Sequence, residues 1–109
     1  MPGPSIAEEI SRSLARGSIH DGARMSTVTR WLRADREFNA WFLAEVKTPE
    51  VSDDAVLSVV TAYGEDQAEV EEAWNAYRDG GGLDAFSAAL ERSLARMAGI
   101  RAAWPARET

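Results

Sequence analysis

The chain lacks cysteine and has a single histidine, His20, among its 109 residues. Disulfide bonds, thiol nucleophiles and zinc sites built from cysteine and histidine are therefore excluded. No apolar run approaches the roughly 18 residues of a membrane-spanning helix, and the first ten residues lack the basic and apolar regions of a signal peptide. We therefore expect a cytoplasmic protein that does not contact a membrane.

Basic residues are the minority, since 12 Lys and Arg stand against 18 Asp and Glu and give a net charge of -6. As a whole such a chain repels polyanions, which excludes uniform coating of nucleic acid or membrane. The negative excess is uneven: residues 1–48 have a balance of +1, whereas residues 49–109 have a balance of -7. We therefore expect two regions with separate tasks, residues 1–48 and residues 49–109, divided at Pro49.

Apolar residues recur three or four positions apart along the chain, and this spacing predicts an all-α fold. In the first region, Ser5 and Glu8 form a capping box for a helix that ends at Gly17. A single turn is expected at residues 18–23. Ser26 then caps a short helix, and Asp35 caps an amphipathic helix that ends before Pro49.

The second region is expected to contain helices at residues 52–63 and 66–78, with a cap at Ser52 and a stop at Gly64. Three glycines at 80–82 are interpreted as a flexible hinge before a long final helix at residues 83–104. This helix is longer than one small domain needs, so we expect part of its apolar stripe to mediate oligomerisation. The alternative is that it packs back on the two preceding helices. The residues expected at the oligomer contact are Leu83, Phe86, Leu90, Leu94 and Met97.

Residues 26–38 combine a short, capped, arginine-bearing helix with a Trp-Leu pair and a second amphipathic helix. This arrangement is typical of a helix-turn-helix with a supporting helix. The alternative is that Val28, Trp31 and Leu32 are simply core and the arginines are solvated. In a recognition helix, polar side chains near its start contact base edges, while arginines contact phosphates. The expected base contacts are Thr27, Thr29 and Arg30, and the expected phosphate contacts are Arg24, Arg33 and Arg36.

Four aromatic residues follow the helical spacing of this region, and we expect them to be core. Their expected role is to hold the recognition helix against the first helix. The four residues are Trp31, Phe38, Trp41 and Phe42.

The pattern Ser-Thr-Val-x-Arg-Trp-Leu-x-x-Asp-x-Glu-Phe at residues 26–38 resembles the helix-turn-helix segment of phage terminase small subunits, and Ile-x-x-x-Leu-Ala-x-Gly at residues 10–17 resembles their first helix. The match covers about 40 of the 109 residues. The resemblance implies a non-catalytic DNA-packaging adaptor of a phage, prophage or gene transfer agent. Such an adaptor forms a homo-oligomer, for example a ring, engages double-stranded DNA and passes it to the large terminase subunit. It needs no cofactor.

Two other functions remain open from the sequence. A helix-turn-helix transcriptional regulator would use the same motif as a dimer. An acidic phage inhibitor would instead mimic the phosphates of DNA and block a nuclease. Enzymatic activity is not expected, because His20 has no nucleophile at a recognisable spacing and the acidic residues lack the pattern of a calcium loop. The acidic residues considered for mimicry are Glu65, Asp66, Glu69, Glu71 and Glu72.

Overall fold

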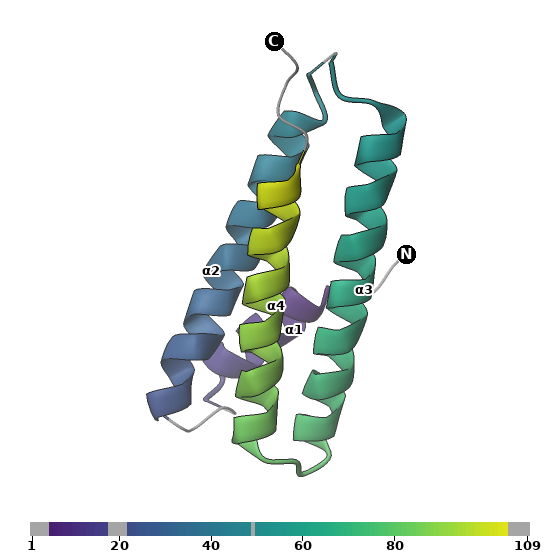
Figure 1. Ribbon diagram of the computed structural model, residues 1–109. Helices are drawn as coiled ribbons and strands as arrows, with labels where there is room; N and C mark the ends of the chain where they lie inside the picture. The colour runs from purple at the N-terminus through teal and green to yellow at the C-terminus, as the bar shows by residue number, and fades with distance from the viewer. Residues whose placement is uncertain (1–4, 18–21, 49, 105–109) are drawn as a thin grey trace.

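The computed structural model describes residues 5–17, 22–48 and 50–104, without the side chains of residues 22–25 (Figure 1). It contains four α-helices: α1 (Ile6–Ala15), α2 (Gly22–Glu45), α3 (Asp53–Arg78) and α4 (Leu83–Ala103). No strand occurs in the described part of the chain, and the predicted all-α class with a long final helix is confirmed. Pro49, the predicted boundary, lies outside the described residues. So do residues 18–21 of the turn predicted at 18–23, whereas residues 22 and 23 already belong to α2.

The three long helices form a bundle in which α2 and α4 run in the same direction and α3 runs opposite to them (Figure 1). Helix α4 packs against both α2 and α3, whereas α1 contacts α2 and α3 but not α4. Helix α1 therefore closes the side of the bundle opposite to α4. All four helices contribute to one hydrophobic core, and the molecule measures 49 × 31 × 20 Å.

Helix α1 begins and ends where the sequence predicts. The Ser5 hydroxyl accepts a hydrogen bond from the Glu8 amide at 3.2 Å, and the Glu8 carboxylate accepts one from the Ser5 amide at 3.2 Å. This capping box satisfies two amides that the helix itself leaves unpaired. Gly17 follows the helix with a φ of 74°, a conformation that favours glycine. Ile6 and Ile10 bury the inner face of α1 in the core.

Helix α2 is continuous from Gly22 to Glu45, so the predicted division into two helices at Asp35 is wrong. Ser26 and Asp35, which we predicted as helix caps, lie inside α2. The reason is a stripe of inward-facing residues, spaced alternately three and four apart, that continues through Asp35 without interruption. No proline or further glycine interrupts it. The stripe consists of Val28, Trp31, Asp35, Phe38 and Phe42.

Helix α3 is likewise continuous, and the predicted stop at Gly64 is wrong. Its predicted N-terminal cap is confirmed, because the Ser52 hydroxyl accepts a hydrogen bond from the Ala55 amide at 3.1 Å. A glycine inside a helix costs only about 1 kcal/mol relative to alanine. Burial of Val59, Val70 and Trp74 on one face offsets that cost, so the helix continues through the glycine.

The glycines between α3 and α4 form a tight turn and not the flexible hinge that we predicted. The Gly81 amide donates to the Ala76 carbonyl at 2.9 Å, and Gly80 has a φ of 103°. A Cβ at Gly81 would lie 2.7 Å from the Ala76 carbonyl oxygen, so only glycine fits there. This cap returns the chain at once, and α4 packs alongside α3.

The predicted aromatic core is confirmed for Trp31 and Phe38, which are buried. Trp41 and Phe42 are half-buried, and both contact Trp104 just after the end of α4, with ring centroids 5.5 and 5.9 Å away. Their predicted packing against the first helix is therefore corrected: these two rings hold the far ends of α2 and α4 together.

Candidate nucleic-acid interface

Three of the six predicted DNA-contact residues lie together on one exposed face of α2. Thr29, Arg33 and Arg36 are spaced four and three residues apart, which places them on the same side of the helix. All three side chains are exposed. Within the described residues, neither Arg33 nor Arg36 forms an ion pair. We call this set the α2 basic face; both of its guanidinium groups are available to a ligand.

Two other predicted DNA-contact residues are held by the protein itself. Arg30 forms an ion pair with Glu91 of α4, and the Thr27 hydroxyl donates to the same carboxylate at 3.3 Å. Both residues therefore connect α2 to α4. The side chain of the sixth residue, Arg24, lies outside the described residues.

Beneath this face, a chain of buried hydrogen bonds connects the three long helices. The Trp31 indole N–H donates to the Ser93 hydroxyl at 2.8 Å, and that hydroxyl donates to Asp66 at 2.8 Å. The second oxygen of Asp66 accepts from Arg96 Nε at 2.7 Å. Arg96 also pairs with Glu69 at 2.7 Å, and this contact holds the pKa of Glu69 below its usual value. Asp66 is only 1% exposed, so it belongs to the interior and not to an acidic surface.

A second cluster of hydrogen bonds surrounds Asp35. The Tyr63 hydroxyl donates to the Asp35 carboxylate at 2.6 Å, and the Asn39 amide donates to the Tyr63 oxygen at 3.0 Å. The Gln67 amide donates to Asp35 at 3.4 Å and to Asp66 at 3.1 Å, so it connects the two clusters. Polar groups of this kind at core positions fix the register of packed helices. We therefore assign the network a structural role: it holds α2 at a fixed height against α3 and α4.

The charge on Asp35 should make stability depend on pH. Burial raises the pKa of Asp35 above 3.8, so the folded protein binds this proton more tightly than the unfolded chain. The free energy of unfolding contributed by Asp35 therefore falls as the pH rises from the unfolded pKa to the folded pKa. The variant Asp35→Asn lacks this effect, and its melting temperature relative to wild type should increase with pH across that interval. Thermal melts of both proteins between about pH 4 and pH 8 measure this difference in melting temperature. A difference that does not change with pH would mean that burial does not raise the pKa of Asp35.

The five residues predicted for the oligomer contact lie in the core of the chain itself. Phe86, Leu90 and Met97 are buried, and Leu83 and Leu94 are half-buried against the same core. Helix α4 thus packs back on the bundle, the alternative arrangement for this segment. Assembly of the protein stays a prediction, and a contact between subunits needs side chains that the bundle leaves exposed.

The described residues contain no group of three or more His, Asp or Glu placed to hold a metal ion. His20 lies outside the described residues. None of the described helices has the length and apolar character to cross a membrane. Comparison of the chain with known protein families, curated proteins and solved structures finds no match.

Proposed function

We propose that the protein is a non-catalytic helical adaptor that binds duplex DNA weakly through the α2 basic face. The main support is the position of Arg33 and Arg36, which lie on the same side of α2 as Thr29. Both are exposed, and neither is paired with a described residue. Arginine binds phosphate with two parallel hydrogen bonds, and threonine hydroxyls also donate to phosphate oxygens. The +1 balance of residues 1–48 keeps this surface from repelling DNA as the acidic second region does.

The continuous α2 determines how this surface meets DNA. A helix-turn-helix presents the start of a separate recognition helix to the major groove, and α2 contains no such break. Side chains along the flank of a long helix contact the phosphate backbone instead, which carries no direct sequence information. We therefore expect little sequence preference. With about two or three phosphates neutralised, log K should fall with log salt with a slope of about -2 to -3.

A weak contact per subunit fits an adaptor that works as an assembly. Several copies that hold one DNA molecule gain avidity without any new contact. Three large apolar side chains remain exposed near the connection between α2 and α3 and are available for contact between copies: Leu43, Leu57 and Val60. We propose that such an assembly is a cytoplasmic homo-oligomer that delivers DNA to a large terminase subunit. Residues 26–38 lie within the unbroken α2, so the exposed arginines support this proposal and a helix-turn-helix does not.

The two alternative functions have less support from the geometry. Mimicry of DNA needs a dense row of exposed, unpaired carboxylates. Of the five considered, Asp66 is buried and Glu69 pairs with Arg92 and Arg96, which leaves three exposed: Glu65, Glu71 and Glu72. A transcriptional regulator of the helix-turn-helix type needs the break that α2 lacks.

Single arginine substitutions test the proposed surface. Arg33→Ala and Arg36→Ala should each weaken binding to a short duplex several-fold and reduce the salt slope by about 1, because each removes one phosphate contact. Fluorescence anisotropy with labelled DNA at several salt concentrations measures both quantities. Arg92→Ala is the matched control, since it removes the same charge from α4. Equal weakening by all three substitutions would mean that net charge, and not the α2 basic face, governs binding.

A further inference from the structure

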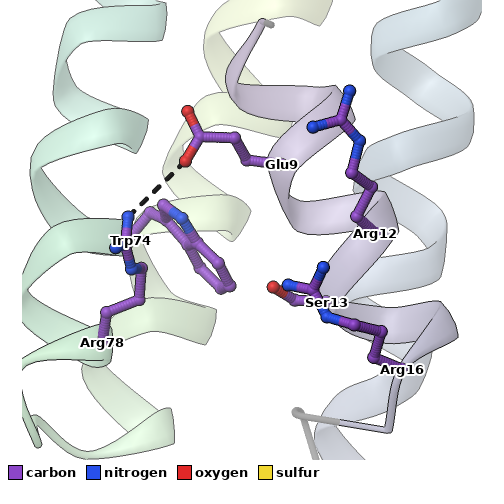
Figure 2. Close-up of a pocket in the computed structure, with 6 residues that line it drawn as sticks. All are labelled: Glu9, Arg12, Ser13, Arg16, Trp74 and Arg78. Atoms are coloured by element: carbon purple, nitrogen blue, oxygen red, sulfur yellow. Dashed lines mark ion pairs between the residues drawn. The ribbon is translucent and has the colours of Figure 1, made fainter.

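A pocket between α1 and α3 gathers three arginines that the proposed function does not use (Figure 2). Arg12 and Arg16 come from α1 and the residue that caps it, and Arg78 comes from the last turn of α3. Ser13 and the indole of Trp74 complete the lining, together with the single acidic residue Glu9. The formal charge of this lining is +2 in a protein whose net charge is -6. We call it the α1–α3 pocket.

The Trp74 indole offers a hydrogen-bond donor that the protein does not use. Its side chain is only 3% exposed, and its Nε1–H has no partner within the described residues. A buried N–H without a partner is destabilising, so a native protein usually satisfies it. The ring itself packs against Tyr77 and Phe86, with centroids 5.8 and 5.4 Å away. What the indole can give a ligand is therefore its N–H and not a face for stacking.

The arginines around this indole are only weakly engaged. Arg78 and Glu9 form an ion pair at 3.6 Å beside the indole (Figure 2). Arg12 lies 3.9 Å from Glu8 on its own helix. Solvent-exposed ion pairs of this kind are weak, so a bound anion can replace the carboxylate of Glu9. Arg16 forms no ion pair with any described residue. The pocket therefore presents guanidinium groups from both of its sides.

We propose that the α1–α3 pocket binds the dianionic phosphate group of a phosphate monoester. Arg16 and Arg12 bind it from α1, and Arg78 turns from Glu9 to bind it from α3, which gives the ligand access to the Trp74 N–H. A phosphate monoester carries close to two negative charges at neutral pH and matches the +2 lining, whereas a carboxylate neutralises half of it. The phosphodiester of duplex DNA carries one charge per phosphate and neutralises only half of this lining. The pocket shares no residue with the α2 basic face.

NMR titration of the full chain with inorganic phosphate and with glycerol phosphate tests the proposal. The indole N–H signal of Trp74, identified by its loss in Trp74→Phe, should shift and saturate, and Arg16→Ala should weaken binding about tenfold or more. Arg33→Ala is the control for charge and should bind like wild type. Equal affinity for the two ligands would mean that the pocket recognises the phosphate group alone. Tighter binding of glycerol phosphate would mean that the glycerol group adds contacts. Both results support the proposal.

The charge of the ligand gives a second, independent readout. Phosphate monoesters lose their second charge below a pKa of about 6, so affinity should fall between about pH 8 and pH 5. Sulfate keeps two charges over this range, so its affinity should not change with pH. The absence of a saturable Trp74 shift, or an equal response of Arg16→Ala and wild type, would overturn the proposal. Neither result would affect DNA binding by the α2 basic face, which the anisotropy experiment measures separately.

Discussion

Replacing Trp31 with alanine is expected to lower the free energy of unfolding by about 3–5 kcal/mol. The Trp31 side chain is fully buried in α2. Its loss leaves a large cavity and removes the donor to the Ser93 hydroxyl. Because a domain of this kind is stable by only about 5–15 kcal/mol in total, the variant should be close to unfolded at physiological temperature. Urea unfolding followed by circular dichroism measures the loss.

Two further variants separate the contributions to this loss. Trp31→Phe keeps most of the ring volume and removes the hydrogen bond, so it should cost clearly less than Trp31→Ala. Trp104→Ala removes an indole of the same size from a half-buried position after α4 and should also cost less. If Trp31→Ala and Trp104→Ala were equally stable, the core would not be centred on Trp31.

Replacing Asp66 with alanine should cost about 3–5 kcal/mol, since it leaves a charged partner without its buried counter-ion. Ser93 and Arg96 both donate to this carboxylate. Arg96 keeps its ion pair with Glu69, which should hold the cost near the lower end of that range. Chemical denaturation of Asp66→Ala and wild type at neutral pH gives the difference directly.

A double variant tests the physical reason for this cost. Asp66→Leu combined with Arg96→Met removes both charges and fills the space with apolar side chains, which often restores stability at buried ion pairs. It should recover at least half of the stability lost in Asp66→Ala. Stability as low as in the single variant would mean that the shape of the Asp66 side chain matters more than its charge.

The sequence predicts the helical class and most outer boundaries because these depend on local signals. Ser5 and Ser52 cap helices as expected, and α4 occupies the predicted segment. Asp35 and Gly64 were misread because each is also a common helix boundary. The spacing of three and four residues continues through both of them, and burial of a long stripe exceeds a local preference of about 1 kcal/mol. The spacing of apolar residues along the whole helix therefore predicts its length better than a single boundary residue does.

The residues of the candidate sites could be predicted from the sequence only where no contact between distant segments was involved. Thr29, Arg33 and Arg36 were each predicted as DNA contacts, but their common face was not predictable while Asp35 was taken as a boundary that placed Arg36 on a separate helix. The engagement of Arg30 was not predictable, because its partner Glu91 is about sixty residues away in the sequence. The α1–α3 pocket was missed for the same reason: Arg16 and Arg78 come together only when α1 packs across the bundle.

The weak attachment of α1 has a consequence for the order in which the protein opens. Helix α1 has ten residues, fewer than the roughly 12–15 that an isolated helix needs to persist in water, so its helicity depends on docking. It makes far fewer contacts with the bundle than α2 and α3 make with α4. Amide hydrogens of α1 should therefore exchange with solvent through a sub-global opening that leaves the other three helices folded. The α1–α3 pocket exists only while α1 is docked, so the two form and disappear together.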